Sequence, residues 1–94
     1  MNLDEEKRRG DHAKRLLDDE LLNETLDRIE KDTLTMWEES PARDTEGRER
    51  LHLFYLACKK FRNELKNVMY TGKMATQQLS ASEKAMEAVK RIFN

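Results

Sequence analysis

Cysteine, proline and glycine are scarce in this sequence, which has one Cys, one Pro and three Gly among its 94 residues. The single cysteine, Cys58, excludes a disulfide within the chain, which fits either a reducing compartment or a protein that is indifferent to redox conditions. Because Pro and Gly are so few, the chain has few points at which a helix must break. No alternating run of β-branched residues is long enough to indicate a strand. These absences favour an all-α protein.

Long apolar runs are also missing. No segment approaches the roughly 18 consecutive apolar residues that a membrane helix needs, so we expect no membrane partner. The N-terminus is acidic, whereas a signal peptide begins with basic and then apolar residues. Charged residues form 39% of the chain and apolar residues 37%. This length and composition predict one domain, residues 1–94, with a small core.

Motifs for catalysis, metal binding or nucleotide binding are not found. His12 and His52 lack further ligands at zinc-binding spacing, and Cys58 falls in an apolar stripe, where a thiol packs as a small hydrophobe. The acidic run at residues 18–20 lacks the alternating oxygen ligands and the glycine of a calcium loop, and helix capping explains it. No glycine-rich phosphate-binding motif occurs. We therefore expect no enzymatic activity, no catalytic residue, no metal, no cofactor and no small-molecule ligand.

A first long helix is predicted at residues 19–39. Asp18 or Asp19 can accept hydrogen bonds from the free amides of its first turn, and Pro41 disfavours helical geometry at Ser40. Between these limits, positions separated by alternating intervals of four and three residues form one helix face. These positions are Leu22, Leu26, Ile29, Thr33 and Met36.

A second helix with a broader apolar stripe is predicted at residues 45–71. Asp44 or Thr45 can cap its start, and Gly72 is expected to end it in the left-handed conformation. The same alternation of four and three residues marks its central face. The positions on that face are Leu51, Tyr55, Cys58, Arg62, Leu65 and Met69.

The two ends of the chain carry weaker signals. Residues 1–10 are predicted to be a frayed, charged segment that ends at Gly10, and Asp11 can cap a short helical stretch after it. Ser80 to Glu83 has the pattern of a capping box, which predicts a short third helix at residues 81–93. Residues 73–79 fit either a linker or a continuation of the preceding helix.

The connection between the two long helices is short, which makes them antiparallel neighbours. Residues 1–50 carry 16 acidic and 10 basic side chains, a balance of −6, whereas residues 51–94 carry 3 and 8, a balance of +5. Opposed charge of this kind suits a chain that folds back on itself. The sequence therefore predicts an all-α antiparallel helical hairpin of the coiled-coil type with a short third C-terminal helix.

The second predicted helix has more apolar surface than one antiparallel neighbour can cover. Large apolar patches on a chain of this kind usually mark an interface. The alternative is a three-helix monomer, in which residues 81–93 fold back over the patch. The predicted interface residues are Trp37, Leu51, Phe54, Tyr55, Cys58, Phe61, Leu65 and Val68.

A basic set on the second helix raises nucleic acid as an alternative partner, for a packaging or regulatory factor. The chain as a whole is not basic, with a sequence pI of about 6.1, and it has neither a helix-turn-helix spacing nor an aromatic platform. A solvated basic face beside the acidic helix is the favoured interpretation. The residues concerned are Lys59, Lys60, Arg62 and Lys66.

Residues 13–75 contain a series of short signatures in a fixed order. They are Leu16–Leu17, Leu21–Leu22 before an acidic helix, Trp37 followed by Ser40, Arg43-Asp44, Arg48-Glu49-Arg50-Leu51, and Gly72-Lys73-Met74-Ala75. In these signatures the chain resembles a family of small uncharacterised helical proteins of tailed bacteriophages and prophages. The family has no assigned activity and no catalytic residues to carry over. The resemblance implies a phage origin among virion or assembly genes, and it leaves out residues 76–94.

Together these features predict a non-enzymatic protein–protein interaction module. The resemblance implies a bacteriophage structural or assembly factor, expected in the virion or in the host cytoplasm. We expect a homo-oligomer that can also bind other phage or host proteins. A small phage inhibitor of a host enzyme, whose acidic helix imitates nucleic acid, is a further alternative.

Overall fold

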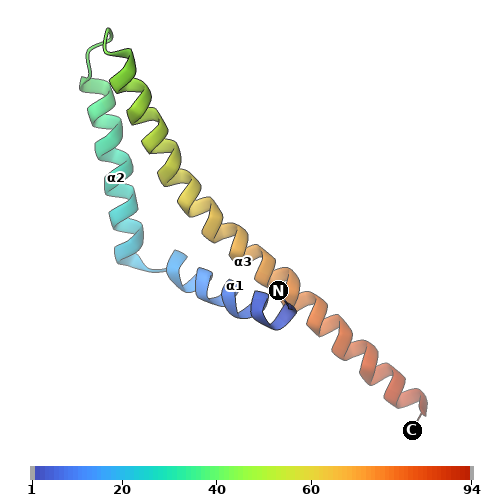
Figure 1. Ribbon diagram of the computed structural model, residues 1–94. Helices are drawn as coiled ribbons and strands as arrows, with labels where there is room; N and C mark the ends of the chain where they lie inside the picture. Colours follow the sequence, from blue (N-terminus) through green and yellow to red (C-terminus); the bar gives the residue numbers. More distant parts are fainter. Residues whose placement is uncertain (1, 94) are drawn as a thin grey trace.

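The computed structural model describes residues 2–93, which form three α-helices joined by short connections (Figure 1). The helices are α1 (Leu3–Leu17), α2 (Glu20–Glu39) and α3 (Thr45–Phe93). The molecule is a rod of 77 × 25 × 17 Å. At a rise of about 1.5 Å per residue, the 49 residues of α3 account for nearly the whole long dimension. The all-α prediction is confirmed.

Helices α1 and α2 follow one another along α3, and both run in the opposite direction to it (Figure 1). The first part of α3 lies beside α2, and its middle packs closely against α1. The last part of α3, coloured orange to red in Figure 1, extends beyond both. The core is therefore a thin seam. Among the described residues no large side chain is fully buried.

Helix α1 corrects the prediction of a frayed segment at residues 1–10. From Leu3 onward this segment is helical, and only Met1 lies outside the described residues. Asn2 caps the helix, because its Oδ1 accepts a hydrogen bond of 2.8 Å from the amide of Glu5. Three acidic residues of the first turn complement the positive end of the helix dipole. They are Asp4, Glu5 and Glu6.

The seam between α1 and α3 is made of small residues. A Cβ atom added to Gly10 would lie 2.6 Å from the Cα of Gly72, so the two helix backbones touch at this point. Ala13 and Ala75 are buried beside them. Counting seven residues each way from this crossing sets Leu3 level with Leu79, and Leu17 level with Leu65. All four of these leucines are half-buried.

Helix α3 is continuous, which corrects two predictions. Gly72 does not end the helix in the left-handed conformation, since no described glycine has a positive φ. Ser80 does not cap a separate third helix, because residues 73–79 and 81–93 both belong to α3. Glycine inside a helix costs about 1 kcal/mol relative to alanine. Contact with α1 at Gly72 supplies the compensating stabilisation.

The junction between α1 and α2 is held by side chains of α2 and of its cap. Asp19 caps α2 through a 2.8 Å hydrogen bond from the amide of Leu22 to its Oδ1. The side-chain amide of Asn23 donates to the carbonyl oxygens of Leu17, at 2.6 Å, and Asp19, at 2.9 Å. Asn23 therefore satisfies an orphan carbonyl at the end of α1 and fixes the bend between the two helices.

The connection between α2 and α3 is closed by Arg48. Its Nη1 donates to the carbonyl oxygens of Trp37 and Ser40 and to the Ser40 hydroxyl, at distances of 2.9–3.2 Å. Its guanidinium carbon lies 4.3 Å from the centre of the Trp37 ring. Asp44 caps α3, since its Oδ1 accepts a hydrogen bond from the amide of Gly47. The positive charge of Arg48 at the C-terminal end of α2 also interacts favourably with the negative end of the helix dipole.

Candidate protein interface

Arg62 links α3 to α2 through acidic side chains. Its Nη2 donates to Asp27 at 2.6 Å, and its Nε lies 3.8 Å from an oxygen of Glu30. The hydrogen bond to Asp27 raises the pKa of the Arg62 guanidinium above its ordinary value. The Glu30 oxygen and the Arg62 Nε are buried and have no hydrogen-bond partner. The two charges are therefore held close to each other without a direct hydrogen bond.

The apolar surface of α3 is organised as one stripe with a seven-residue repeat, which we call the α3 stripe. Positions seven residues apart drift by only about 20° around a helix, so each series forms a continuous line. The stripe consists of Leu51, Phe54, Cys58, Phe61, Leu65, Val68, Gly72, Ala75, Leu79, Ser82, Met86 and Val89.

Helix α1 covers only the middle of the α3 stripe. By the register of the glycine crossing, it spans the levels from Leu65 to Leu79, where stripe residues are half-buried or buried. Two ends remain. The upper section contains Phe54 and Phe61, and the lower section contains Met86 and Val89. No helix of this chain lies over the lower section. Helix α2 lies beside the upper section at Leu51, but Phe54 and Phe61 stay outside that contact, and the four side chains are 47–60% exposed.

The structure divides the predicted interface residues among separate places. Trp37, Leu51 and Tyr55 line one open hollow of about 200 Å³ between α2 and α3, together with Thr33, Leu34 and His52. Phe54 and Phe61 do not line that hollow. They lie two turns apart in the upper section, exposed by 52% and 50%. Cys58 is half-buried.

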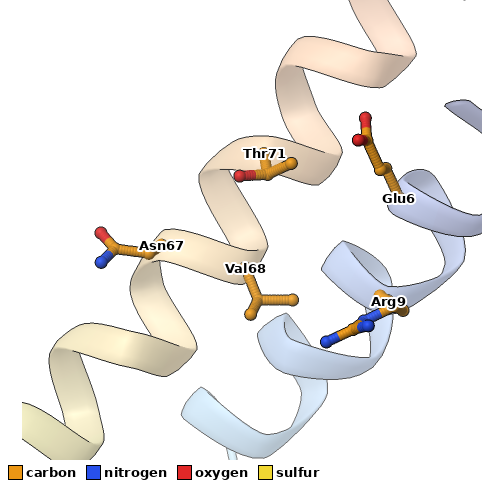
Figure 2. A pocket seen from close by; sticks show the side chains of 5 residues that line it. All are labelled: Glu6, Arg9, Asn67, Val68 and Thr71. Carbon is orange, nitrogen blue, oxygen red and sulfur yellow. The ribbon is translucent and has the colours of Figure 1, made fainter. Parts of the chain in front are cut away.

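Leu65 and Val68 lie beside α1 and are half-buried there, which the sequence did not predict. Val68 also borders a hollow of about 240 Å³ along the α1–α3 seam, lined by residues of both helices. Figure 2 shows Glu6 and Arg9 of α1 across this hollow from Asn67, Val68 and Thr71 of α3. These two predicted interface residues therefore belong in part to the contact within the chain.

The basic residues predicted as a nucleic-acid contact do not act as one set. Arg62 is engaged with Asp27 and Glu30, and 24% of its side chain is exposed. The Lys59 ammonium lies 4.9 Å from the centre of the Tyr55 ring. Lys60 and Lys66 are exposed.

Among the described residues, no group of three or more His, Cys, Asp or Glu side chains is placed to hold a metal ion. Within the same residues, every helix is too short or too polar to cross a membrane.

Sequence reasoning missed the contact between α1 and α3, although a signal for it exists. The spacing Gly-x-x-Ala occurs twice, at residues 10–13 and 72–75. Small residues three apart on each of two helices allow the backbones to approach closely. The two motifs meet in the structure, since Gly10 lies against Gly72 and both alanines are buried.

Comparison of the chain with protein-family models, with curated protein sequences and with solved structures finds no match.

Proposed function

We propose that this protein is a non-enzymatic protein–protein interaction module that associates with itself through the apolar surface of α3. One observation carries the proposal. Phe54 and Phe61 are half exposed on a section of the α3 stripe that α1 does not reach, and they lie outside the hollow between α2 and α3. Exposed contiguous apolar surface of this kind is characteristic of interaction sites. Residues 81–93 do not fold back over these side chains, because they continue α3 away from them at the far end of the molecule.

The shape of the molecule supports the proposal. A rod with a thin core buries little apolar surface by itself, and a partner would add to that burial. Fully burying a large apolar side chain contributes about 1.5–3 kcal/mol. Burial of Phe54 and Phe61 against a second protein surface would therefore stabilise the complex.

We further propose a role as a bacteriophage structural or assembly factor, in the virion or the host cytoplasm. This part rests on the resemblance of residues 13–75 to small phage and prophage proteins. Other phage or host proteins are then the natural additional partners.

The experiment is size-exclusion chromatography with light scattering on the wild type and on a Phe54→Ser/Phe61→Ser variant. The wild type is expected to exceed the monomer mass at high concentration, and the variant to lie closer to it. A Leu53→Ser/Leu56→Ser variant is the control, because it removes two exposed apolar side chains outside the α3 stripe. Equal loss of association in both variants, or a monomeric wild type, would contradict the proposal. A mobility-shift assay with DNA and RNA separates the nucleic-acid alternative, whose binding would weaken steeply with salt.

A further inference from the structure

The lower section of the α3 stripe lies on a helix segment that no other part of the chain supports. Residues 80–92 extend beyond the start of α1, and all of their side chains are exposed. Three large apolar side chains lie on this segment. They are Met86, Val89 and Ile92, exposed by 60%, 47% and 76%.

The two flanks of the lower section differ in chemistry. Helical spacing places Glu83 and Lys90 along one flank, seven residues apart, and these residues line an open hollow with Leu79, Ser82, Met86 and Glu87. The same spacing places Ala85 and Ile92 along the other flank. One flank is therefore charged and the other is apolar.

This difference selects an orientation for self-pairing. In a parallel helix pair, each flank meets the opposite flank of its neighbour, so Glu83 and Lys90 would face apolar residues. In an antiparallel pair, each flank meets the same flank of the second copy. Glu83 then lies opposite Lys90 of the second copy, twice by symmetry, and Ala85 lies opposite Ile92. Both pairings form in a single register, in which Met86 lies level with Val89 of the second copy.

We propose that residues 80–92 pair in antiparallel fashion, about a two-fold axis, with the same residues of a second copy of this chain. The proposal deepens the function proposed above, because it names the occupant and orientation of one uncovered section, and it rests on self-association. The observation that carries it is the placement of Glu83 and Lys90, opposite in charge and seven residues apart, on one flank of a helix segment that no other helix covers.

The start of α1 fits this arrangement. Helix α1 runs antiparallel to α3, and so does the paired segment of the second copy, so both point the same way along the α3 stripe. The second copy's segment would thus continue the line of α1. Its basic last turn, with Lys90 and Arg91, comes toward the acidic first turn of α1, with Asp4 and Glu5. Opposite charges and aligned helix dipoles both favour this meeting.

The size of the contact sets its strength. About four helical turns from each chain bury less than the roughly 1,200–2,000 Å² of a stable interface. We therefore expect association at micromolar or higher concentrations rather than a permanent dimer. Exposed ion pairs add little affinity, but like charges in the wrong orientation are disfavoured.

Sedimentation equilibrium across the micromolar range tests the pairing with full-length variants. Glu83→Lys and Lys90→Glu each replace two attractions by two repulsions, so each should weaken dimerisation by about tenfold. The double variant Glu83→Lys/Lys90→Glu restores opposite charges and should return to the wild-type constant. Lys84→Glu is the matched control, because it makes the same charge change away from the flank. Circular dichroism shows whether each variant keeps its helix content.

The outcomes separate this inference from the proposed function. Failure of the double variant to recover, or an equal effect of Lys84→Glu, overturns the antiparallel pairing. If all the charge variants associate like the wild type and only Phe54→Ser/Phe61→Ser is monomeric, the proposed function stands and this pairing falls. A wild type that stays monomeric throughout overturns both.

Discussion

Gly10 of α1 and Gly72 of α3 bring two helix backbones into direct contact. A Cβ atom on either residue would lie 2.6 Å from the Cα of the other, and one on Gly72 would also lie 3.0 Å from the Glu6 carbonyl oxygen. Real Cβ atoms do not approach backbone this closely. The obstruction is backbone rather than a flexible side chain, so a substitution must push the helices apart.

Replacing Gly72 by alanine should therefore destabilise the protein. In an isolated helix the same change stabilises by about 1 kcal/mol, but here overpacking costs about 1–3 kcal/mol. We expect a lower midpoint in urea unfolding followed by circular dichroism. Gln77→Ala, on an exposed position of the same helix, should leave the midpoint unchanged or raise it. A Gly72→Ala variant that is more stable than the wild type would show that α1 does not pack against α3 in this way.

Replacing Arg62 should lower the free energy of unfolding more than replacing Asp27, its hydrogen-bonded partner. Arg62→Met leaves Glu30, whose side chain is only 16% exposed, without its cation. Loss of one partner of a buried charge pair costs about 3–5 kcal/mol, and partial exposure here reduces that to about 1–3 kcal/mol. Asp27 is 67% exposed, so Asp27→Asn should cost about 0–1 kcal/mol.

A double substitution distinguishes the loss of attraction between Arg62 and Glu30 from the cost of leaving Glu30 buried without a cation. Arg62→Met combined with Glu30→Leu removes both charges and should recover much of the stability, because apolar residues of similar volume can replace such a pair. Urea unfolding of the wild type, the two single variants and the double variant measures the coupling. Additive losses would mean that Arg62 and Glu30 do not interact.

Replacing Arg48 should loosen the connection between α2 and α3. Arg48→Ala removes the donor to Trp37 and Ser40, which should cost about 1–2 kcal/mol. Trp37 is the only tryptophan, so its fluorescence reports the loss of the guanidinium from its ring. Arg48→Lys should not restore the wild-type spectrum, because an ammonium lacks the planar fork and the stacking face.

Arg50→Ala is the control for that prediction. Arg50 pairs with Glu46 at a fully solvated position, where both side chains are more than 75% exposed. Its removal should change stability by only a few tenths of a kcal/mol and leave Trp37 emission unaltered. Equal spectra for the wild type and Arg48→Ala would contradict the cation–π contact.

The continuity of α3 through Ser80 can be tested by proline. Inside a helix, Ala81→Pro costs about 3 kcal/mol and breaks the segment, so the helical signal should fall. If a separate helix began at residue 81, proline would occupy its first position without penalty. Ser80→Ala tests the same point with a substitution that should not disrupt a continuous helix. It should preserve or raise the helical signal of a continuous helix, whereas loss of a cap would lower it.

Much of the secondary structure could be predicted from local signals. Spacing by four and three residues identified the apolar faces, and Pro41 and Asp44 marked the connection before α3. The errors arose at Gly10, Gly72 and Ser80. Each is a residue type that ends or caps helices when considered alone, and each lies inside a helix here.

For the two glycines the reason is a tertiary contact between segments far apart in the chain. Gly10 and Gly72 are favoured inside helices only because they lie against each other, and neither local sequence contains that information. The same contact explains the candidate interface. Leu65 and Val68 were predicted to be free for a partner, but α1 half covers them, whereas Phe54 and Phe61 lie beyond its reach.

Hydrogen–deuterium exchange at low and high protein concentration tests most directly whether another copy covers what one chain leaves exposed. If a second copy covers these surfaces, amide exchange becomes slower in residues 80–92 and around Phe54 and Phe61 at high concentration and stays unchanged at the Gly10–Gly72 crossing. Exchange that is identical at both concentrations in every part of α3 would show that no second copy covers them.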